Sequence, residues 1–170
     1  TSASYTTGLS VYADDNLDQY RCVISAVGAV DVTTNSAVLL VLRTYSITAQ
    51  PSNATASEGG TASFSISATS SSGTPTYQWE RSDDGGANYT PVTGATNASY
   101  TTPTLVFAND NLDRYRCVVS LVGSLEDSNG TPQVSSHGEL TVLRVISIST
   151  QPNSTAVIEG ASGTFTIVAS

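Results

Sequence analysis

The sequence contains no lysine and no methionine, and only 12% of its 170 residues are charged. All six cations are arginines, and the acidic excess gives a formal net charge of −8. A surface with this charge repels the phosphate backbone of nucleic acids and the anionic face of membranes, so neither is an expected partner. No apolar run approaches the roughly 18 residues of a membrane-spanning helix, so we expect no membrane insertion.

Helical patterns are also missing. No window shows the sustained apolar stripe of an amphipathic helix. Ser, Thr, Ala and Val are abundant instead, and Thr, Val, Tyr and Ile favour strands. The sequence therefore predicts an all-β fold. Because it has neither an initiating methionine nor a signal-peptide pattern, we expect a mature product or a segment of a longer polypeptide.

An internal repeat is the strongest pattern present. Residues 96–120 align without a gap on residues 1–25 at an offset of 95, and residues 146–170 align on residues 45–69 at an offset of 101. The six extra residues fall in the loop at 126–132. The repeat is thus about 100 residues long. We expect the C-terminal part of one repeat (1–43), one complete repeat (44–143) and the first strands of the next (144–170).

Short strands separated by turns fill the complete repeat. Residues 61–69 alternate between apolar and serine side chains, as a half-buried strand does, while Pro51 bends the chain and Gly85-Gly86 marks a hairpin. The predicted strands of the complete repeat are 46–49, 61–69, 76–81, 89–92, 98–102, 104–108, 113–122 and 139–143. Those of the first part are 5–7, 9–13, 19–26 and 37–42.

Three motifs carry a family resemblance. Y-Q-W at 77–79 resembles the third strand of an immunoglobulin-like domain, and D-N-L-D-R-Y-R-C at 110–117 resembles its sixth strand with the corner tyrosine. E-G-G-T-A-S-F-S-I at 58–66 resembles the entry to the second strand. The repeat as a whole resembles the immunoglobulin-like repeats found in tandem in bacterial surface proteins and tailed-phage structural proteins. This resemblance implies tandem antiparallel β-sandwiches with Greek-key connections.

The resemblance also implies a set of core residues. In antibody-type domains a second-strand cysteine pairs with the sixth-strand cysteine, but Ile66 stands at the second-strand position here. We therefore expect Cys22 and Cys117 to be free thiols in two separate cores, with an intermolecular bridge as the alternative. The expected core residues are Phe64, Ile66, Trp79, Tyr115 and Cys117 in the complete repeat, Tyr20 and Cys22 in the first part, and Phe165 in the third.

Candidate metal ligands are sparse. The pattern Asp14-x-Asn16-x-Asp18 and its counterpart at 110–113 resemble the beginning of a calcium loop. The loop glycine is missing and Ser25 stands at the twelfth position, so we favour an acidic turn leading into the tyrosine strand. His137, the only histidine, lacks partners at ligand spacing and is expected on the surface. We expect no cofactor, with calcium as the alternative.

Catalytic motifs are absent from the sequence. It contains no recurring Ser-His-Asp set, nucleophile elbow or phosphate loop. Glu80 with Asp83 or Asp84 could form a carboxylate pair, but these residues lie at a hairpin tip, where a solvated turn is expected. The sequence therefore predicts a protein that is not an enzyme.

Two features bear on ligands. Tyr89, with Tyr77 and Tyr100, could form an aromatic platform for a surface glycan, and cross-strand packing within the sheet is the alternative. Five Asn-x-Ser/Thr sites occur, and they matter only in a source that glycosylates. These sites are Asn53, Asn88, Asn97, Asn129 and Asn153.

The connections between repeats indicate the role. Residues 38–47 and 140–148 each run from a last strand into a first strand without a Gly/Ser or Pro-rich spacer. Such short connections should restrict changes in the angle between neighbouring sandwiches. Sandwiches joined this way form a semi-rigid rod. The sequence thus predicts a structural module of an extracellular fibre, cell surface or virion appendage. Its partners would be other copies of the repeat, in cis or by fibre assembly, and strand exchange between chains is a further hypothesis. The alternatives are a glycan-binding adhesin module and an accessory domain of a secreted enzyme.

Overall fold

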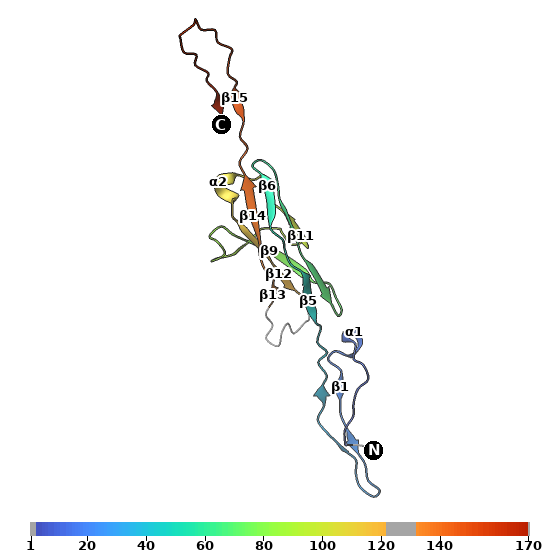
Figure 1. Cartoon of the computed structure of the whole chain (residues 1–170). Coiled ribbons are helices and arrows are strands. Elements are labelled where there is room, and N and C mark those ends of the chain that lie inside the picture. Colours follow the sequence, from blue (N-terminus) through green and yellow to red (C-terminus); the bar gives the residue numbers. More distant parts are fainter. Residues whose placement is uncertain (1–2, 122–131, 170) are drawn as a thin grey trace.

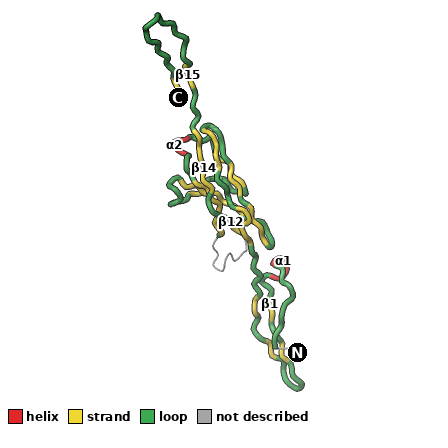
Figure 2. Tube along the Cα trace, in the orientation of Figure 1, coloured by secondary structure: helices red, strands yellow, loops and turns green. Residues whose placement is uncertain are grey.

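The computed structural model describes residues 3–121 and 132–169, and the chain follows one long axis (Figure 1). A β-rich body formed by residues 45–121 and 132–143, here called the central sandwich, lies between the N-terminal and C-terminal segments (Figure 2). Within the described residues the helical elements are two four-residue turns, α1 (Tyr12–Asp15) and α2 (Phe107–Asp110). The all-β prediction is confirmed.

One sheet of the central sandwich contains four strand segments: β5 (Tyr45–Ala49), β7 (Ser63–Ser65), β8 (Ser67–Ser70) and β11 (Ser99–Thr101). β5 pairs antiparallel with β8, and β7 pairs antiparallel with β11. Between β7 and β8, the N–H of Ile66 donates to the carbonyl of Ala98 at 3.0 Å, so the two pairs join through one continuous strand. The predicted alternation of residues 61–69 is confirmed, since Ala62, Phe64 and Ile66 are buried.

The second sheet has the strand order β10-β9-β12-β14-β6, and β13 also pairs with β12. Its longest ladder joins β9 to β12 over seven residue pairs, from Arg114 opposite Ser82 to Ser120 opposite Thr76. The pairings are antiparallel except for β14 with β6, which is parallel. The strands are β6 (Ala54–Ser57), β9 (Thr76–Ser82), β10 (Thr90–Pro91), β12 (Arg114–Ser120), β13 (Gln133–Val134) and β14 (Gly138–Leu143).

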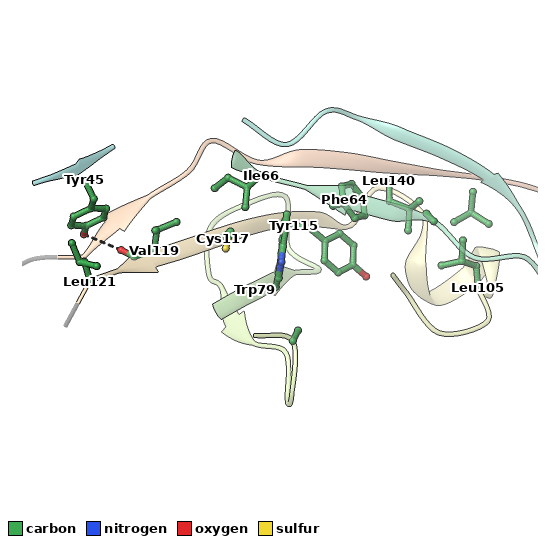
Figure 3. Packing of buried hydrophobic residues seen from close by; sticks show 13 residues of the cluster. Tyr45, Phe64, Ile66, Trp79, Leu105, Tyr115, Cys117, Val119, Leu121 and Leu140 are labelled. Atoms are coloured by element: carbon green, nitrogen blue, oxygen red, sulfur yellow. Dashed lines mark hydrogen bonds between the residues drawn. The ribbon is translucent and has the colours of Figure 1, made fainter. Parts of the chain in front are cut away.

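The two sheets enclose one buried apolar cluster (Figure 3). Trp79 and Cys117 are directly opposite each other on β9 and β12, and both are fully buried. The Phe64 ring from the first sheet stacks on the Tyr115 ring at 4.7 Å between centroids. Burying one large apolar side chain contributes about 1.5–3 kcal/mol, so this cluster supplies the main stabilisation of the central sandwich.

The bend predicted at Gln50-Pro51 transfers the chain from one sheet to the other. Before it β5 pairs with β8, and after it β6 pairs parallel to β14, from Ala54 opposite Leu140 to Ser57 opposite Leu143. Two sheets that are antiparallel apart from this one pairing, and that share a first strand in this way, form the immunoglobulin-like sandwich. The predicted fold class is confirmed.

The segments outside the central sandwich contain only short ladders. In the N-terminal segment, β1 (Gln19–Tyr20) pairs with β4 (Ala37–Val38), and β2 (Val23–Ile24) pairs with β3 (Val32–Thr33). In the C-terminal segment, β15 (Ile148–Thr150) pairs with β16 (Val168–Ala169). Part of the predicted insertion loop, residues 126–131 with Asn129, lies outside the described residues.

Three strand predictions are wrong. Residues 5–7, 9–13 and 104–108 do not form strands, and the helical turns α1 and α2 begin within the second and third of these stretches. Apolar residues and threonine in these stretches suggested β structure. The carboxylates of Asp15 and Asp110 instead bind backbone N–H groups four residues earlier and close a helical turn.

The core assignment is wrong for two residues. Cys22 is exposed, and Phe165 is 66% exposed, although their counterparts Cys117 and Phe64 are buried. The physical reason is that the sequence contains a single tryptophan, so neither terminal segment has a counterpart of Trp79 to pack against. Tyr20 is half-buried against the ring of Tyr5, at 5.8 Å between centroids.

Candidate functional site

The turn that follows residue 10 recurs after residue 105 with the same hydrogen bonds. The N–H of Val11 donates to the Asp15 carboxylate at 2.6 Å, and that of Val106 donates to the Asp110 carboxylate at 2.7 Å. Each turn ends with a leucine in the left-handed backbone region, Leu17 at φ 72° and Leu112 at φ 71°. Non-glycine residues rarely adopt this conformation, so its recurrence marks one local structure formed twice.

The acidic turns use their side-chain oxygens for the backbone. Asn16 Oδ1 accepts the N–H of Val41 at 3.1 Å, and Asn111 Oδ1 accepts the N–H of Val142 at 2.9 Å. The turn therefore holds β14 in the central sandwich and the stretch directly after β4 in the N-terminal segment. Across residues 3–121 and 132–169, no three His, Cys, Asp or Glu side chains gather as metal ligands do, and the acidic turns act as structural corners.

Each turn presents an aromatic ring to an arginine that follows the last strand. We call residues 43–44 the first joint and residues 144–147 the second joint. At the first joint the Arg43 guanidinium lies 3.8 Å from the centroid of the Tyr12 ring. At the second joint the Arg144 guanidinium lies 4.4 Å from the centroid of the Phe107 ring. Both are cation–π contacts, each stabilising by about 0.5–1 kcal/mol at an exposed site.

The first joint also contacts the central sandwich. A Cβ at Gly73 would lie 3.0 Å from Arg43 Nη1 and 3.4 Å from Leu121 Cδ1, so the arginine packs closely against this end of the sandwich. Ser71 and Thr44 exchange two hydrogen bonds, N–H of Ser71 to the Thr44 carbonyl at 2.8 Å and N–H of Thr44 to Ser71 Oγ at 3.0 Å. Arg43 therefore connects the N-terminal segment to the sandwich.

The second joint borders an open pocket of about 360 Å³ at the opposite end of the sandwich, lined by Glu58, Phe107, Ala108, Arg144, Val145 and Ile146. The Glu58 carboxylate accepts the N–H of Phe107 at 3.1 Å and fixes the turn that presents the ring. Arg144 is exposed here, whereas Arg43 is half-buried. Both joints thus have the same arginine–ring contact. At the first joint the arginine is also covered by the end of a sandwich, whereas at the second joint it is exposed.

The proposed ligand contact Tyr89 is half-buried under an arginine. The Arg116 guanidinium lies 3.8 Å from the centroid of the Tyr89 ring, and its Nε lies 2.8 Å from a Glu80 carboxylate oxygen. One face of the ring is therefore engaged within the sheet. Tyr100 packs 5.5 Å from the Tyr115 ring at the edge of the core, so these tyrosines contribute to packing.

An ion-pair group lies at the entry to β12. The Arg81 Nε is 2.5 Å from Asp113, whose side chain is only 3% exposed, and Arg81 Nη2 is 3.4 Å from Asp110. Burial raises the pKa of the Asp113 carboxyl, which the neighbouring Arg81 opposes. The group faces a cavity of about 320 Å³ bordered by Tyr100 and Tyr115. It fixes the corner of the sandwich from which α2 projects.

The remaining predicted site residues lie inside or on the rim of the sandwich. Trp79 donates its indole N–H to the Asn97 carbonyl at 2.9 Å. Both cysteines are free, and burial raises the pKa of the Cys117 thiol to about 11. His137 is exposed between β13 and β14. At the hairpin tip, Asp84 accepts hydrogen bonds from its own loop, so it serves the turn.

Sequence reasoning missed the arginine–aromatic contacts. The signal was present, since Tyr12 and Phe107 share the offset of 95 and Arg43 and Arg144 share the offset of 101. A repeat comparison that follows charged and aromatic residues at the ends of each repeat would have found both pairs.

None of the helices in the described part of the chain is long and apolar enough to cross a bilayer. Among solved structures, the chain is similar to the N-terminal Ig1-2 module of the Drosophila receptor protein tyrosine phosphatase DLAR, with 19% identity, a TM-score of 0.42, and coverage of 64% of this chain and 57% of that chain. It is also similar to Sidekick-1 immunoglobulin domains 1–5 (14% identity, TM-score 0.47, 85% of this chain and 30% of that chain). A third similar structure is Duf (Kirre) D1, with 18% identity, a TM-score of 0.40, and coverage of 60% of this chain and 99% of that chain.

The chain therefore spans little more than half of the first of these structures and less than a third of the second. No curated protein matches its sequence. One family does match: residues 47–142, more than half of the chain and nearly the whole central sandwich, fit the family described as "Domain of unknown function (DUF8696)". The chain belongs to this family, and the matched segment is its immunoglobulin-like sandwich.

Proposed function

We propose that this chain is a non-enzymatic structural module whose immunoglobulin-like repeats stack end to end into a semi-rigid rod of an extracellular fibre or virion appendage. The partners are further copies of the same repeat. The proposed units are residues 1–43, the C-terminal part of one repeat, residues 44–143, a complete repeat, and residues 144–170, the first strands of the next.

The observation that carries this proposal is the recurrence of the joint. An arginine that follows the last strand contacts an aromatic ring on the preceding turn at both ends of the central sandwich, Arg144 directly after β14 and Arg43 five residues after β4. β5 begins at Tyr45, directly after the first joint, and β15 begins at Ile148, directly after the second. Joints this short, without glycine or proline, limit bending, so each added repeat extends the rod.

The terminal segments support the same reading. Their apolar residues are exposed at positions that are buried in the central sandwich, as Cys22 is relative to Cys117 and Phe165 relative to Phe64. The N-terminal segment also repeats a hydrogen bond of the central sandwich, since the N–H of Cys22 binds Thr34 Oγ1 at 3.0 Å and that of Cys117 binds Ser135 Oγ at 2.8 Å. This recurrence supports the proposal that the N-terminal segment is part of a further copy of the repeat.

Small-angle X-ray scattering on chains of graded length tests the proposal. One, two or three copies of residues 43–143 are inserted after Leu143, which preserves the joint sequence at every junction. A rod predicts that the maximum dimension increases by a constant increment with each copy. Flexible linkage predicts growth close to the square root of the number of repeats, and that result would refute the rod.

A further inference from the structure

The surface at the second joint is uncovered. Arg144 covers one face of the Phe107 ring, and the adjoining pocket of about 360 Å³ is open. Val145 is 60% exposed and Ile146 is 79% exposed. The polar groups here are few: the Arg144 guanidinium and the carboxylate of Glu58 line the same pocket.

At the first joint the corresponding surface is occupied. There the arginine lies between the Tyr12 ring on one side and Gly73 with Leu121 on the other. Gly73 belongs to the loop that joins β8 to β9, and Leu121 directly follows β12. The occupant of the first joint is thus one end of an immunoglobulin-like sandwich, and it turns an exposed arginine into a half-buried one.

We propose that the Phe107–Arg144 surface binds the β8–β9 loop and the end of β12 of a following copy of this repeat, as Arg43 and Tyr12 do at the first joint. The arginine is then sandwiched between the aromatic turn of one repeat and the loop of the next, and it sets the angle between them. This inference rests on the proposed rod and names the residues that stiffen it.

The chemistry of the loop fits the surface. Residues 71–75 are Ser-Ser-Gly-Thr-Pro, small and uncharged, so they approach a guanidinium without burying a second charge. Gly73 has φ +79°, a conformation in which a side chain is strained, and an added Cβ would lie 3.0 Å from the arginine. An anionic ligand would meet both charges in the same pocket, so the repulsion by Glu58 would offset the attraction by Arg144.

The test uses the full chain with one copy of residues 43–143 inserted after Leu143, so that two complete sandwiches share one joint. Ser65, an exposed residue of β7, is replaced by cysteine in both sandwiches for spin labelling, and Cys22→Ser removes the exposed native thiol. Cys117 is buried and is not labelled. Double electron–electron resonance then measures the distribution of distances between the two labels.

The unsubstituted chain should give one narrow distribution. In this chain Arg43 of the inserted copy directly follows Leu143 and so takes the position of Arg144 beside Phe107. Arg43→Ala in the inserted copy, or Phe107→Ala in the first sandwich, should broaden the distance distribution about twofold or more, because the cation–π contact and its packing are lost. Arg116→Ala is the matched control. It removes a cation–π contact with Tyr89, at 3.8 Å, that lies within one sandwich and away from the joint, so the width of the distance distribution should stay unchanged.

Gly73→Ala in the inserted copy should also broaden the distribution, whereas Gly85→Ala, at φ +75° with no atom near its Cβ, should not. A narrow distribution that none of the joint substitutions changes overturns the inference while leaving the rod intact, and it assigns the surface to another occupant. A distribution that is already broad in the unsubstituted chain refutes the rod itself. Trp79 fluorescence checks that each variant is folded. If Phe107→Ala does not fold, Phe107→Leu takes its place.

Discussion

Removing one hydroxyl from Tyr45 tests how the strand after the first joint is held. The Tyr45 side chain is 8% exposed, and its hydroxyl donates to the Val119 carbonyl at 3.0 Å and accepts the N–H of Gln133 at 3.0 Å. Tyr45 thereby connects β5 to the second sheet only two residues after Arg43. Tyr45→Phe keeps the ring and removes both hydrogen bonds.

The magnitude follows from the two groups left without a partner. A buried donor or acceptor that loses its partner costs about 1–3 kcal/mol. Gln133 is only partly buried, so water can compensate part of the loss, and we expect about 2 kcal/mol in total. Because the urea m-value of a domain of this size is about 1 kcal/mol per molar, the unfolding midpoint should fall by about 2 M.

Urea unfolding followed by Trp79 fluorescence measures this shift, since Trp79 is the only tryptophan and lies in the core. Tyr5→Phe is the matched control: its side chain is 76% exposed, so its midpoint should stay within experimental error. A Tyr45→Phe midpoint indistinguishable from that of the control would refute the assignment of Tyr45 as a buried link between the two sheets.

Three further predictions concern the interior and the hairpin. One thiol per chain, Cys22, should react with an aromatic disulfide reagent under native conditions, and Cys117 should react only in denaturant, because it is buried and its pKa is about 11. Gly138→Ala should destabilise the sandwich by about 1–3 kcal/mol, because an added Cβ would overlap the Ser52 carbonyl oxygen. Hydrogen bonds within its loop lower the pKa of Asp84 below 3.8, so its contribution to stability should be present above that pH and lost as the pH falls further; Asp84→Ala should reduce this loss.

Each of these has a clear contrary result. Two native-reactive thiols would place Cys117 at the surface. A Gly138→Ala variant within about 0.5 kcal/mol of the parent, like the expected result for Gly8→Ala, where the added Cβ meets no atom within 4 Å, would show that β14 does not cross so close to Ser52. For Asp84, acid unfolding curves that are parallel in parent and variant would show that the carboxylate is not specifically stabilised.

Local pattern was enough to predict the sandwich. The serine and apolar alternation around Phe64 identified a strand with one buried face, and the resemblance of residues 110–117 to an immunoglobulin-like domain implied the sixth strand with Tyr115 and Cys117. These signals lie within single strands, where side-chain period and backbone geometry are directly coupled. The same is true of the hairpin glycines, Gly85 and Gly86, which both adopt positive φ.

Long-range pairing was not predictable in this way. β6 consists of small residues, two of which are alanines that are depleted in strands, and it forms because β14, more than 80 residues away in sequence, offers a free edge. Residues 104–108 have strand composition, yet the carboxylate of Asp110 captures the Val106 N–H and starts a helical turn. Cys22 and Phe165 were assigned to cores by repeat position, whereas burial depends on the partners around them.

The central claim is that successive sandwiches are held at one angle by the arginine–aromatic joint. Residual dipolar couplings of the backbone amides, measured on the chain with one inserted copy of residues 43–143, test it most directly. The account predicts that both sandwiches fit a single alignment tensor with one relative orientation. Two tensors of different magnitude, with the second sandwich reoriented independently of the first, would contradict it.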